Sequence, residues 1–329
     1  MTENYQPPFT ISKKILALVA EISEVVGYLD AAGLDPASPQ LRKGNLVKTI
    51  TSTLAIEVNT LSVEQVSAII DGKRVAGPVR EIGEVHGAIK AYENLAGFEM
   101  ASEKDLLAAH RLLMGDVLAK AGVYRRASVG IKQGEDVVHV APGAEMVPQL
   151  VRGLLHWLAT TDHHPLVASS VFHYEFEFIH PFADGNGRMG RLWQTLILSR
   201  WKDVFASLPL ESVIREQQDG YYQTLRRADD SGDSTEFIEF MLAAILTACR
   251  DAARTSSDVP INVPKDVPLK RRQRIVALIA ADRAITIARF AELCQVSSKT
   301  IKRDIALLKD ENRLVRLGSQ KSGHWQVQP

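Results

Sequence analysis

The sequence predicts a mainly α-helical protein: a helical core with a β-hairpin flap, an N-terminal helical region before it and a winged helix domain after it. Three observations predict this class. Hydrophobic residues recur at helical spacing over most of the chain. One short segment alternates at strand spacing. A proline-containing stretch separates a basic C-terminal part from the rest. A length of 329 residues indicates two or three domains.

The composition is that of a globular protein, with 46% hydrophobic and 24% charged residues. The cysteines, Cys249 and Cys294, are too few for a disulfide framework and form no CxxC pair, which favours a reducing compartment without structural zinc. The N-terminus lacks the basic and apolar regions of a secretory signal. No stretch approaches the ~18 apolar residues of a membrane span. We therefore expect a cytoplasmic protein with no membrane partner.

The charge is balanced in total, with 39 basic and 39 acidic residues, but not along the chain. From Lys265 onward there are 14 basic and 6 acidic residues, which leaves 25 basic and 33 acidic residues before it. The sign changes beside a segment with three prolines, and a softer boundary lies near residues 71–78. The expected parts are an N-terminal helical region (1–75), a core (76–255), a linker (256–268) and a winged helix domain (269–329).

The first helical region follows from periodicity. Apolar residues from Ile15 to Val26 recur at i, i+3 and i+4, a second helical run covers residues 46–54, and a third opens at Ser62, where Ser-Val-Glu-Gln is typical of a capping box. Further helices are expected over residues 106–118, 147–159 and 166–178. Between them, residues 127–140 alternate around Gln-Gly-Glu-Asp, which indicates a hairpin. Because a lone hairpin is marginally stable, we expect a flap or clamp.

The segment HPFADGNGRMGR, residues 180–191, carries the strongest chemical signal. Pro181 ends the preceding helix, because the residue before a proline is disfavoured in helical conformation. Asp-Gly-Asn-Gly is turn chemistry, with two glycines that can take positive φ, and the apolar run from Leu192 indicates a buried helix. A glycine-containing loop before a helix N-terminus is a site for anions such as phosphate.

The charged residues of this segment fit a polyphosphate. Arg188 and Arg191 are three residues apart, so both project from one side of the first helical turn. The helix dipole disfavours cations there unless an anion lies between them. Asp184 is a hard oxygen ligand suited to Mg²⁺ on a polyphosphate, and His180 can accept a proton from an attacking hydroxyl.

The segment resembles the motif of the Fic family, HxFx(D/E)GNGRxxR, and matches it at every specified position. The flanks agree: residues 172–179 resemble the helix that leads into the Fic loop, and residues 127–140 lie where the family has its target-binding flap. The resemblance covers roughly residues 1–255. It implies a nucleotidyltransferase that moves AMP from ATP, with Mg²⁺, onto a Ser, Thr or Tyr hydroxyl of a protein target or of the enzyme itself, releasing pyrophosphate.

The same resemblance implies roles for the matched residues. His180 would be the general base, and Asp184 would hold Mg²⁺ between the α- and β-phosphates. Phe182 would anchor the loop in the core. The nucleotide-binding set would comprise an anion hole, two phosphate-binding arginines and a tyrosine pair around the adenosine, for which ordinary packing is the alternative: Gly185, Asn186, Gly187, Arg188, Arg191, Tyr221 and Tyr222.

An inhibitory helix is expected near residue 57. Many Fic proteins carry the pattern (S/T)xxxE(G/N), which this chain matches at Thr53 and Glu57 but not at Val58; an asparagine, Asn59, follows one residue late. The resemblance implies that Glu57 pairs with Arg191 and keeps that arginine from the γ-phosphate of ATP. In some relatives the same glutamate positions a water molecule that removes AMP from the modified protein. The resemblance therefore also leaves open that this protein removes AMP.

The basic C-terminal part resembles a DeoR-like winged helix. Helices are expected over residues 271–281 and 285–293, a turn over residues 294–296, a third helix from Ser297 or Ser298, and a wing over residues 314–317 and 324–327. The third helix would contact DNA, and the alternative is a protein-interaction or dimerisation module. The DNA-binding candidates crowd its N-terminal half: Lys299, Thr300, Lys302 and Arg303.

Other interpretations stay open at this point. The transferred group could be UMP, phosphate or phosphocholine, as in a few Fic relatives. The protein could be a transcription regulator whose core senses a nucleotide or is idle. A metal hydrolase using His163, His164, His173 and His180 is disfavoured because HExxH-like spacing is absent. The target protein, an operator sequence and assembly into a homo-oligomer are not readable from the sequence.

Overall fold

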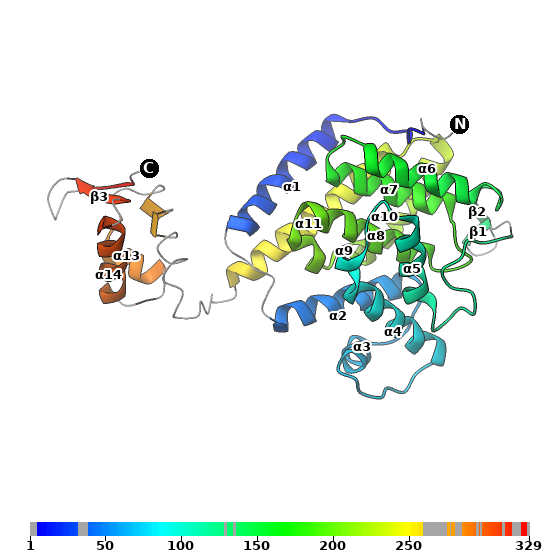
Figure 1. Cartoon of the computed structure of the whole chain (residues 1–329), viewed down its shortest axis with the longest axis horizontal. Coiled ribbons are helices and arrows are strands. Elements are labelled where there is room, and N and C mark those ends of the chain that lie inside the picture. The colour runs from blue at the N-terminus through cyan, green and yellow to red at the C-terminus, as the bar shows by residue number, and fades with distance from the viewer. Residues whose placement is uncertain are drawn as a thin grey trace. The chain divides into compact units, whose positions relative to one another are not determined.

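In the computed structural model the chain forms two compact units, Met1–Ser256 and Ser257–Pro329. The described residues are 5–31, 39–127, 130–133, 136–258, 275–276, 278–279, 285–293, 296, 298–310, 313–317 and 324–327. Parts of the predicted linker, first C-terminal helix, turn and wing lie outside them, including Cys294 and Ser297. The prediction of a mainly helical fold is confirmed (Figure 1).

The first unit begins with three helices, α1 (Lys13–Ala31), α2 (Pro39–Ile56) and α3 (Val63–Ile70). Ile15, Ile22 and Val26 of α1 are buried, as the periodicity predicts. The capping box is also confirmed: the Ser62 hydroxyl accepts from the Gln65 amide at 3.3 Å, and the Gln65 side chain accepts from the Ser62 amide at 2.9 Å. α2 continues beyond residue 54, and this extension carries the segment around Glu57 to the site described below.

The centre of this unit is a pair of buried helices, α7 (Pro165–Ile179) and α8 (Asn186–Trp201). They pack most extensively against each other, and nearly all of their side chains are buried, as expected for helices enclosed on all sides. In Figure 1, α8 lies in the middle of the unit, among the other elements. These are α4 (Val79–Glu93), η1 (Leu95–Gly97), α5 (Glu103–Met114), α6 (Val147–Thr160), η2 (Asp203–Ser207), α9 (Leu210–Glu216), α10 (Gln218–Ser231) and α11 (Thr235–Asp258). Among the described helices, none is long and apolar enough to cross a bilayer.

The predicted hairpin is present as β1 (Gly130–Gln133) and β2 (Asp136–Val140). The strands pair antiparallel, with Gly130 opposite Val140 and a register shift after Ile131. Within the described strands the two form a sheet of their own, so the hairpin extends no larger sheet. This isolation agrees with the expectation of a flap rather than a sheet nucleus.

The second unit contains α13 (Ile287–Leu293), α14 (Ser298–Asp310), β3 (Leu314–Leu317) and β4 (His324–Val327). The strands pair antiparallel over the predicted wing residues. Trp325 is buried, and its indole nitrogen donates to the Ile285 carbonyl at 3.0 Å. The core of the second unit is formed by one side of α14 together with residues from the rest of the unit: Ile275, Ile279, Ile285, Phe290, Ile301, Ile305, Leu308, Leu314 and Trp325.

Candidate active site

His180 terminates α7 in a left-handed conformation, with φ 49° and ψ 60°. A non-glycine residue with positive φ is uncommon and directs the chain sharply out of the helix. Nδ1 of His180 lies 3.4 Å from the Glu177 carbonyl oxygen. Because a carbonyl only accepts, Nδ1 carries the hydrogen in this contact, and the proton-accepting lone pair of the neutral ring is on Nε2.

The loop after His180 is closed by Asn186. Its side-chain oxygen accepts from the Phe182 amide at 2.8 Å, and its side-chain nitrogen donates to the Phe182 carbonyl at 2.9 Å. Phe182 is fully buried and stacks on His110 with ring centroids 3.7 Å apart. The Asn186 side chain is therefore committed to loop closure, so any contribution it makes to an anion hole comes through its backbone.

His110 fixes the backbone of Asp184, although no local sequence signal pointed to it. Its Nδ1 accepts from the Gly122 amide at 2.8 Å, so Nε2 is the donor in the 3.0 Å contact with the Asp184 carbonyl. Burial lowers the pKa of His110 to about 4, which keeps the ring neutral. A neutral histidine with a defined ring orientation thus holds the loop at the backbone of Asp184.

Arg125, for which no sequence signal exists, connects the loop to both ends of the hairpin segment. It is buried, and Nε donates to the His180 carbonyl at 2.7 Å. Nη1 donates to the Ala127 carbonyl at 2.9 Å and Nη2 to the Pro142 carbonyl at 2.5 Å. One side chain therefore sets the base of the hairpin against the residue that carries the proposed general base.

The helix α8 begins at Asn186, so Arg188 and Arg191 lie on its first turns, ahead of the apolar run from Leu192. Of the two glycines, only Gly185 takes positive φ, at 84°. Gly187 is helical, and it matters for close approach instead: a Cβ there would lie 2.4 Å from Oε1 of Glu57 and 3.1 Å from Nη1 of Arg191. The Glu57 carboxylate thus lies against the N-terminus of α8, where an anion is favoured.

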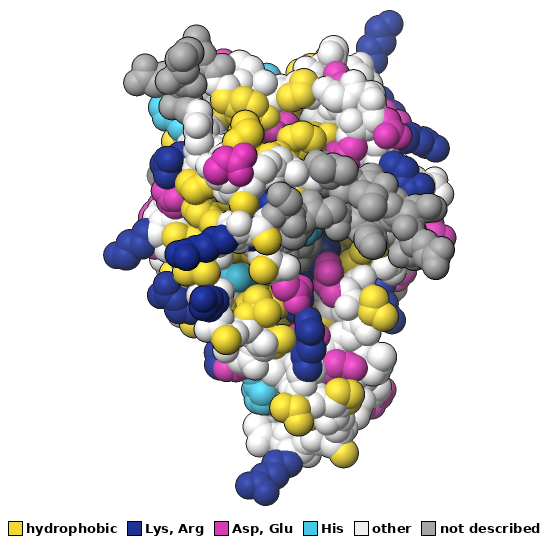
Figure 2. Space-filling model, turned by 90° about the vertical axis from the view of Figure 1, so that its right-hand side faces the viewer, with side chains coloured by type: hydrophobic (Ala, Val, Ile, Leu, Met, Phe, Trp, Pro, Cys, Tyr) yellow, Lys and Arg dark blue, Asp and Glu magenta, His cyan; other side chains and the backbone are white. Residues whose placement is uncertain are grey.

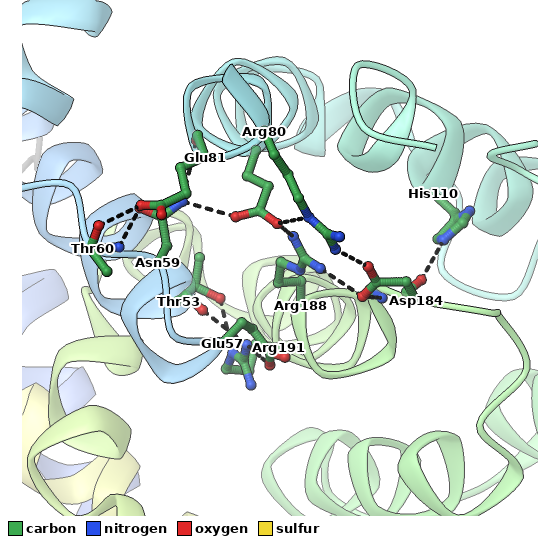
Figure 3. Close-up of polar contacts among 12 residues, drawn as sticks. Thr53, Glu57, Asn59, Thr60, Arg80, Glu81, His110, Asp184, Arg188 and Arg191 are labelled. Carbon is green, nitrogen blue, oxygen red and sulfur yellow. Dashed lines mark hydrogen bonds and ion pairs between the residues drawn. The ribbon is translucent and has the colours of Figure 1, made fainter. Parts of the chain in front are cut away.

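Arg191 is held by the end of α2, as Figure 3 shows. Its Nε donates to the Thr53 hydroxyl at 2.9 Å, and Nη2 donates to the Thr53 carbonyl at 3.1 Å and to Oε1 of Glu57 at 2.8 Å. Burial is the largest single influence on the pKa of the Arg191 guanidinium and lowers it, but the charge and hydrogen bond of Glu57, together with Tyr221 and Glu177, make the net shift upward. Arg191 is therefore a buried cation whose counter-ion is Glu57.

Val58, the departure from the inhibitory pattern, has φ 68° and is 82% exposed. A β-branched residue in this conformation is strained by about 1–2 kcal/mol, because its Cβ approaches the following carbonyl. Glycine or asparagine adopts it at lower cost. The segment that holds Arg191 therefore ends on a strained residue.

A second cluster of charged side chains surrounds Asp184 (Figure 3). Nη2 of Arg188 donates to Oδ1 of Asp184 at 2.9 Å, and Nη2 of Arg80 donates to Oδ2 at 2.7 Å. Glu84, also unforeseen, lies 3.3 Å from Nη1 of Arg188 and accepts from the Asn59 side chain at 2.9 Å. The chain around the end of α2, residues 53–59, thus contacts Arg191 directly and Arg188 through Glu84.

The two motif arginines keep unused donors within the described part of the chain. Nε and Nη1 of Arg188 and Nη1 of Arg191 are buried without a hydrogen-bond partner there, and the Glu84 contact is an ion pair only. Buried donors are normally satisfied, so these three mark a place for an anion. On the face drawn in Figure 2, acidic and basic side chains are interspersed. The positive charge that could bind a polyphosphate is therefore confined to the arginines of the site.

The tyrosine pair divides into a buried and an exposed member. The Tyr221 hydroxyl lies 3.0 Å from Nε2 of His173, whose pKa burial lowers to about 3. Tyr222 is exposed, and its hydroxyl donates to the Ile56 carbonyl at 3.4 Å, beside Glu57. Tyr221 therefore packs in the core, whereas Tyr222 lies at the surface beside the end of α2.

The remaining histidines of the hydrolase interpretation are separated by the fold. His163 stacks edge-on against Phe9, and Nδ1 of His164 accepts from the Leu166 amide at the start of α7. Over the described residues, no group of three or more His, Cys, Asp or Glu side chains could hold a metal ion. The described residues thus contain no histidine cluster that could support metal-dependent hydrolysis.

Comparison with known proteins identifies the fold. Residues 101–198 match the model of the Fic/DOC family. The crystal structure of a Fic family protein from Desulfovibrio desulfuricans is 43% identical and aligns over 98% of both chains, with a TM-score of 0.75. The chain belongs to the Fic family. Fic-1 from C. elegans, 24% identical over 73% of this chain and 72% of its own with a TM-score of 0.57, shares the fold.

Two relatives have a named activity. The protein adenylyltransferase Fic of Drosophila virilis is 27% identical over 82% of this chain, and that of Nematostella vectensis is 32% identical over 57%. This Fic protein covers 55% and 44% of their lengths, so it spans about half of each relative. Residues 271–318 match the DeoR-like helix-turn-helix domain. The chain therefore joins a Fic core to a helix-turn-helix domain.

Proposed function

We propose that this Fic protein transfers AMP from Mg-ATP to a hydroxyl group of a protein target, or to itself, and that Glu57 holds it in an inhibited state. The observation that carries the proposal is the position of Arg188 and Arg191 on the first turns of α8, with buried donors unused. The named activity of the two adenylyltransferase relatives supports it.

His180 would act as the general base. In the reaction the target hydroxyl oxygen forms a bond to the α-phosphorus, the bond from that phosphorus to the bridging oxygen breaks, and pyrophosphate leaves. The hydroxyl proton passes to Nε2 of His180, since Nδ1 already carries a hydrogen toward the Glu177 carbonyl. Arg125 holds the His180 carbonyl and thereby positions the ring.

The negative charge of the triphosphate would be balanced by the N-terminus of α8, Arg188 and Arg191. Asp184 fits a divalent cation, because its carboxylate is 31% exposed and already attracts two guanidinium groups. When bound there, Mg²⁺ would neutralise negative charge on the phosphates. Positioning and neutralisation of this kind are what phosphoryl-type transfer chiefly requires.

The conformation described here would be the inhibited one. Arg191 points at Thr53 and Glu57, and the Glu57 carboxylate occupies the space over Gly187. A γ-phosphate that paired with Arg191 would have to displace that carboxylate. We propose that this competition limits the rate, and that the strain at Val58 makes the inhibition weaker than glycine or asparagine would.

The donor labels separate the proposal from its nearest alternatives. With ATP labelled at the α-phosphorus we expect labelled protein, and with ATP labelled at the γ-phosphorus none, because pyrophosphate leaves. UTP should label the protein poorly. Radiolabel retained on the protein after electrophoresis is the measurement. Label from γ-ATP would indicate phosphate transfer, and preferred label from UTP would indicate UMP transfer.

The second unit would bind DNA through α14. The helix buries Ile301, Ile305 and Leu308 on one side. On the exposed side it presents Lys299, Lys302 and Arg303 at the spacing of one helical face. Thr300 of the same turn is half-buried. A basic face on the third helix of a helix-turn-helix is the arrangement that meets the major groove.

Charge reversal on α14 tests this second function. Lys302→Glu with Arg303→Glu should weaken binding to mixed-sequence duplex DNA at least about tenfold and flatten its salt dependence, because two phosphate contacts are lost. Fluorescence anisotropy at several salt concentrations measures both. Lys13→Glu with Lys104→Glu changes the net charge equally on the first unit. Equal loss in both double variants, or an absence of DNA binding by the wild type, would favour a protein-interaction module.

A further inference from the structure

Arg80 is a third arginine at the candidate active site, and it lies outside the Fic motif. It stands in the first turn of α4 and reaches Asp184, as Figure 3 shows. Nη2 donates to Oδ2 of Asp184 at 2.7 Å, and Nε lies 3.4 Å from Oε1 of Glu84. Glu84 is nearly buried and fixed by Asn59, so it orients the Arg80 guanidinium toward Asp184.

The two cations on Asp184 differ in how easily they can leave. The Arg188 side chain is 3% exposed, whereas that of Arg80 is 64% exposed. An exposed ion pair contributes at most about 1 kcal/mol, so Arg80 can turn into solvent at small cost. The buried Arg188 side chain cannot turn into solvent in this way. Arg80 is therefore the cation that an incoming ligand of Asp184 would displace.

A divalent cation would need the oxygen that Arg80 occupies. Oδ1 of Asp184 already accepts from the Gly185 amide at 2.6 Å and from Arg188. Oδ2 faces Arg80. For Oδ2 to become a metal ligand, the guanidinium must move, because two cations cannot share one carboxylate oxygen at contact distance without strong repulsion.

We infer that Arg80 competes with the divalent cation for Asp184 and thereby sets how strongly nucleotide binding depends on the metal. The inference rests on the proposed function, in which Mg-ATP binds at this site. While the metal is absent, Arg80 neutralises Asp184 and keeps its carboxylate from repelling the triphosphate. Once the metal is bound, it performs that neutralisation itself, and Arg80 is only a competitor.

The two forms of ATP should therefore respond in opposite directions to Arg80→Gln. Binding of Mg-ATP should tighten, because the competing cation is gone. Binding of ATP in EDTA should weaken, because Oδ2 of Asp184 then faces the phosphates without a cation, while Oδ1 keeps Arg188. The ratio of the two dissociation constants, metal-free over Mg-bound, should rise about fivefold, which corresponds to one exposed ion pair.

Isothermal titration calorimetry with ATP in excess Mg²⁺ and with ATP in EDTA measures the ratio without relying on turnover. The titrations use the full chain in the Glu57→Gly background, so that Arg191 is available. Arg227→Gln removes an equally exposed, ion-paired arginine away from the site and should leave the ratio unchanged. Arg80→Lys retains the charge and should give a smaller rise than glutamine. Thermal unfolding checks that each variant is folded.

The outcomes separate the inference from the proposed function. A ratio that is unchanged in Arg80→Gln, or equal weakening of both forms of ATP, would overturn the inference, since Arg80 would then be an ordinary phosphate contact. If the Glu57→Gly protein binds ATP in neither condition, the proposed function itself fails. If it binds both forms and only the Arg80 ratio stays flat, the proposed function stands and the role of Arg80 does not.

Discussion

Replacing Glu57 with glycine is expected to raise the rate of AMP transfer by about 10- to 100-fold, the range of a typical coupling between two sites. The reason is local. The Glu57 carboxylate pairs with Nη2 of Arg191 at 2.8 Å and fills the space over Gly187. Without it, Arg191 can pair with a phosphate, and the N-terminus of α8 is open to an anion. The measurement is the initial rate of protein labelling from α-labelled ATP.

Val58→Asn gives the opposite arm of the same experiment. Asparagine tolerates the left-handed conformation that strains valine, so the inhibitory segment should be steadier and labelling slower than in the wild type. Glu24→Gly places the same substitution at an exposed position of α1 and should have no effect on the rate. Equal labelling by the wild type and Glu57→Gly would remove the inhibitory role of Glu57.

His180→Ala is expected to reduce AMP transfer by about a thousandfold, a usual loss for a general base. The variant should be made in the Glu57→Gly background, where the starting rate is high. Affinity for Mg-ATP should change little, because the proposed role of His180 is to take a proton from the target hydroxyl and not to bind the phosphates. Labelling kinetics measures the first quantity and calorimetry the second.

His156→Ala is the matched control, since His156 is exposed on α6 and has no proposed part in the reaction. It should label at the rate of its parent. Undiminished labelling by His180→Ala would refute the assignment of the general base. Loss of ATP binding together with labelling would instead indicate that the loop had collapsed, and thermal unfolding distinguishes that case.

The fold class was predictable because its signals are local. The helical periodicity of α1, the capping box at Ser62 and the alternating hairpin each lie within a short window of sequence. The start of α8 was partly predictable: Arg188 and Arg191 were expected on its first turn, before the buried apolar run from Leu192. The helix starts at Asn186, whose side chain closes the loop on Phe182.

The candidate site could be proposed from the sequence where one continuous motif carries it, but not where the fold completes it. His180, Asp184, Arg188 and Arg191 lie within twelve residues of one another. Arg80, Glu84, His110 and Arg125 come from elements far away in the sequence, and each acts through a contact that only the packed helices create. Of the unforeseen contacts, Asn59 alone had a sequence signal, as the asparagine displaced by one residue from the inhibitory pattern.

The strain at Val58 and the helical state of Gly187 could not be predicted from the sequence either. The pattern at residue 58 showed a departure, but only the backbone φ shows that valine occupies the conformation that glycine would. For Gly187, turn propensity suggested positive φ, whereas the need is room for the Glu57 carboxylate. Conformation and clearance both depend on the partner segment, which the local sequence does not contain.

Intact-mass spectrometry of the protein after incubation with Mg-ATP tests the central claim most directly. The account predicts that the Glu57→Gly protein gains the mass of AMP, that the wild type gains it far more slowly, and that Glu57→Gly with His180→Ala does not gain it. An equal gain of AMP by the wild type and Glu57→Gly, or a gain of a single phosphate in place of AMP, would contradict it.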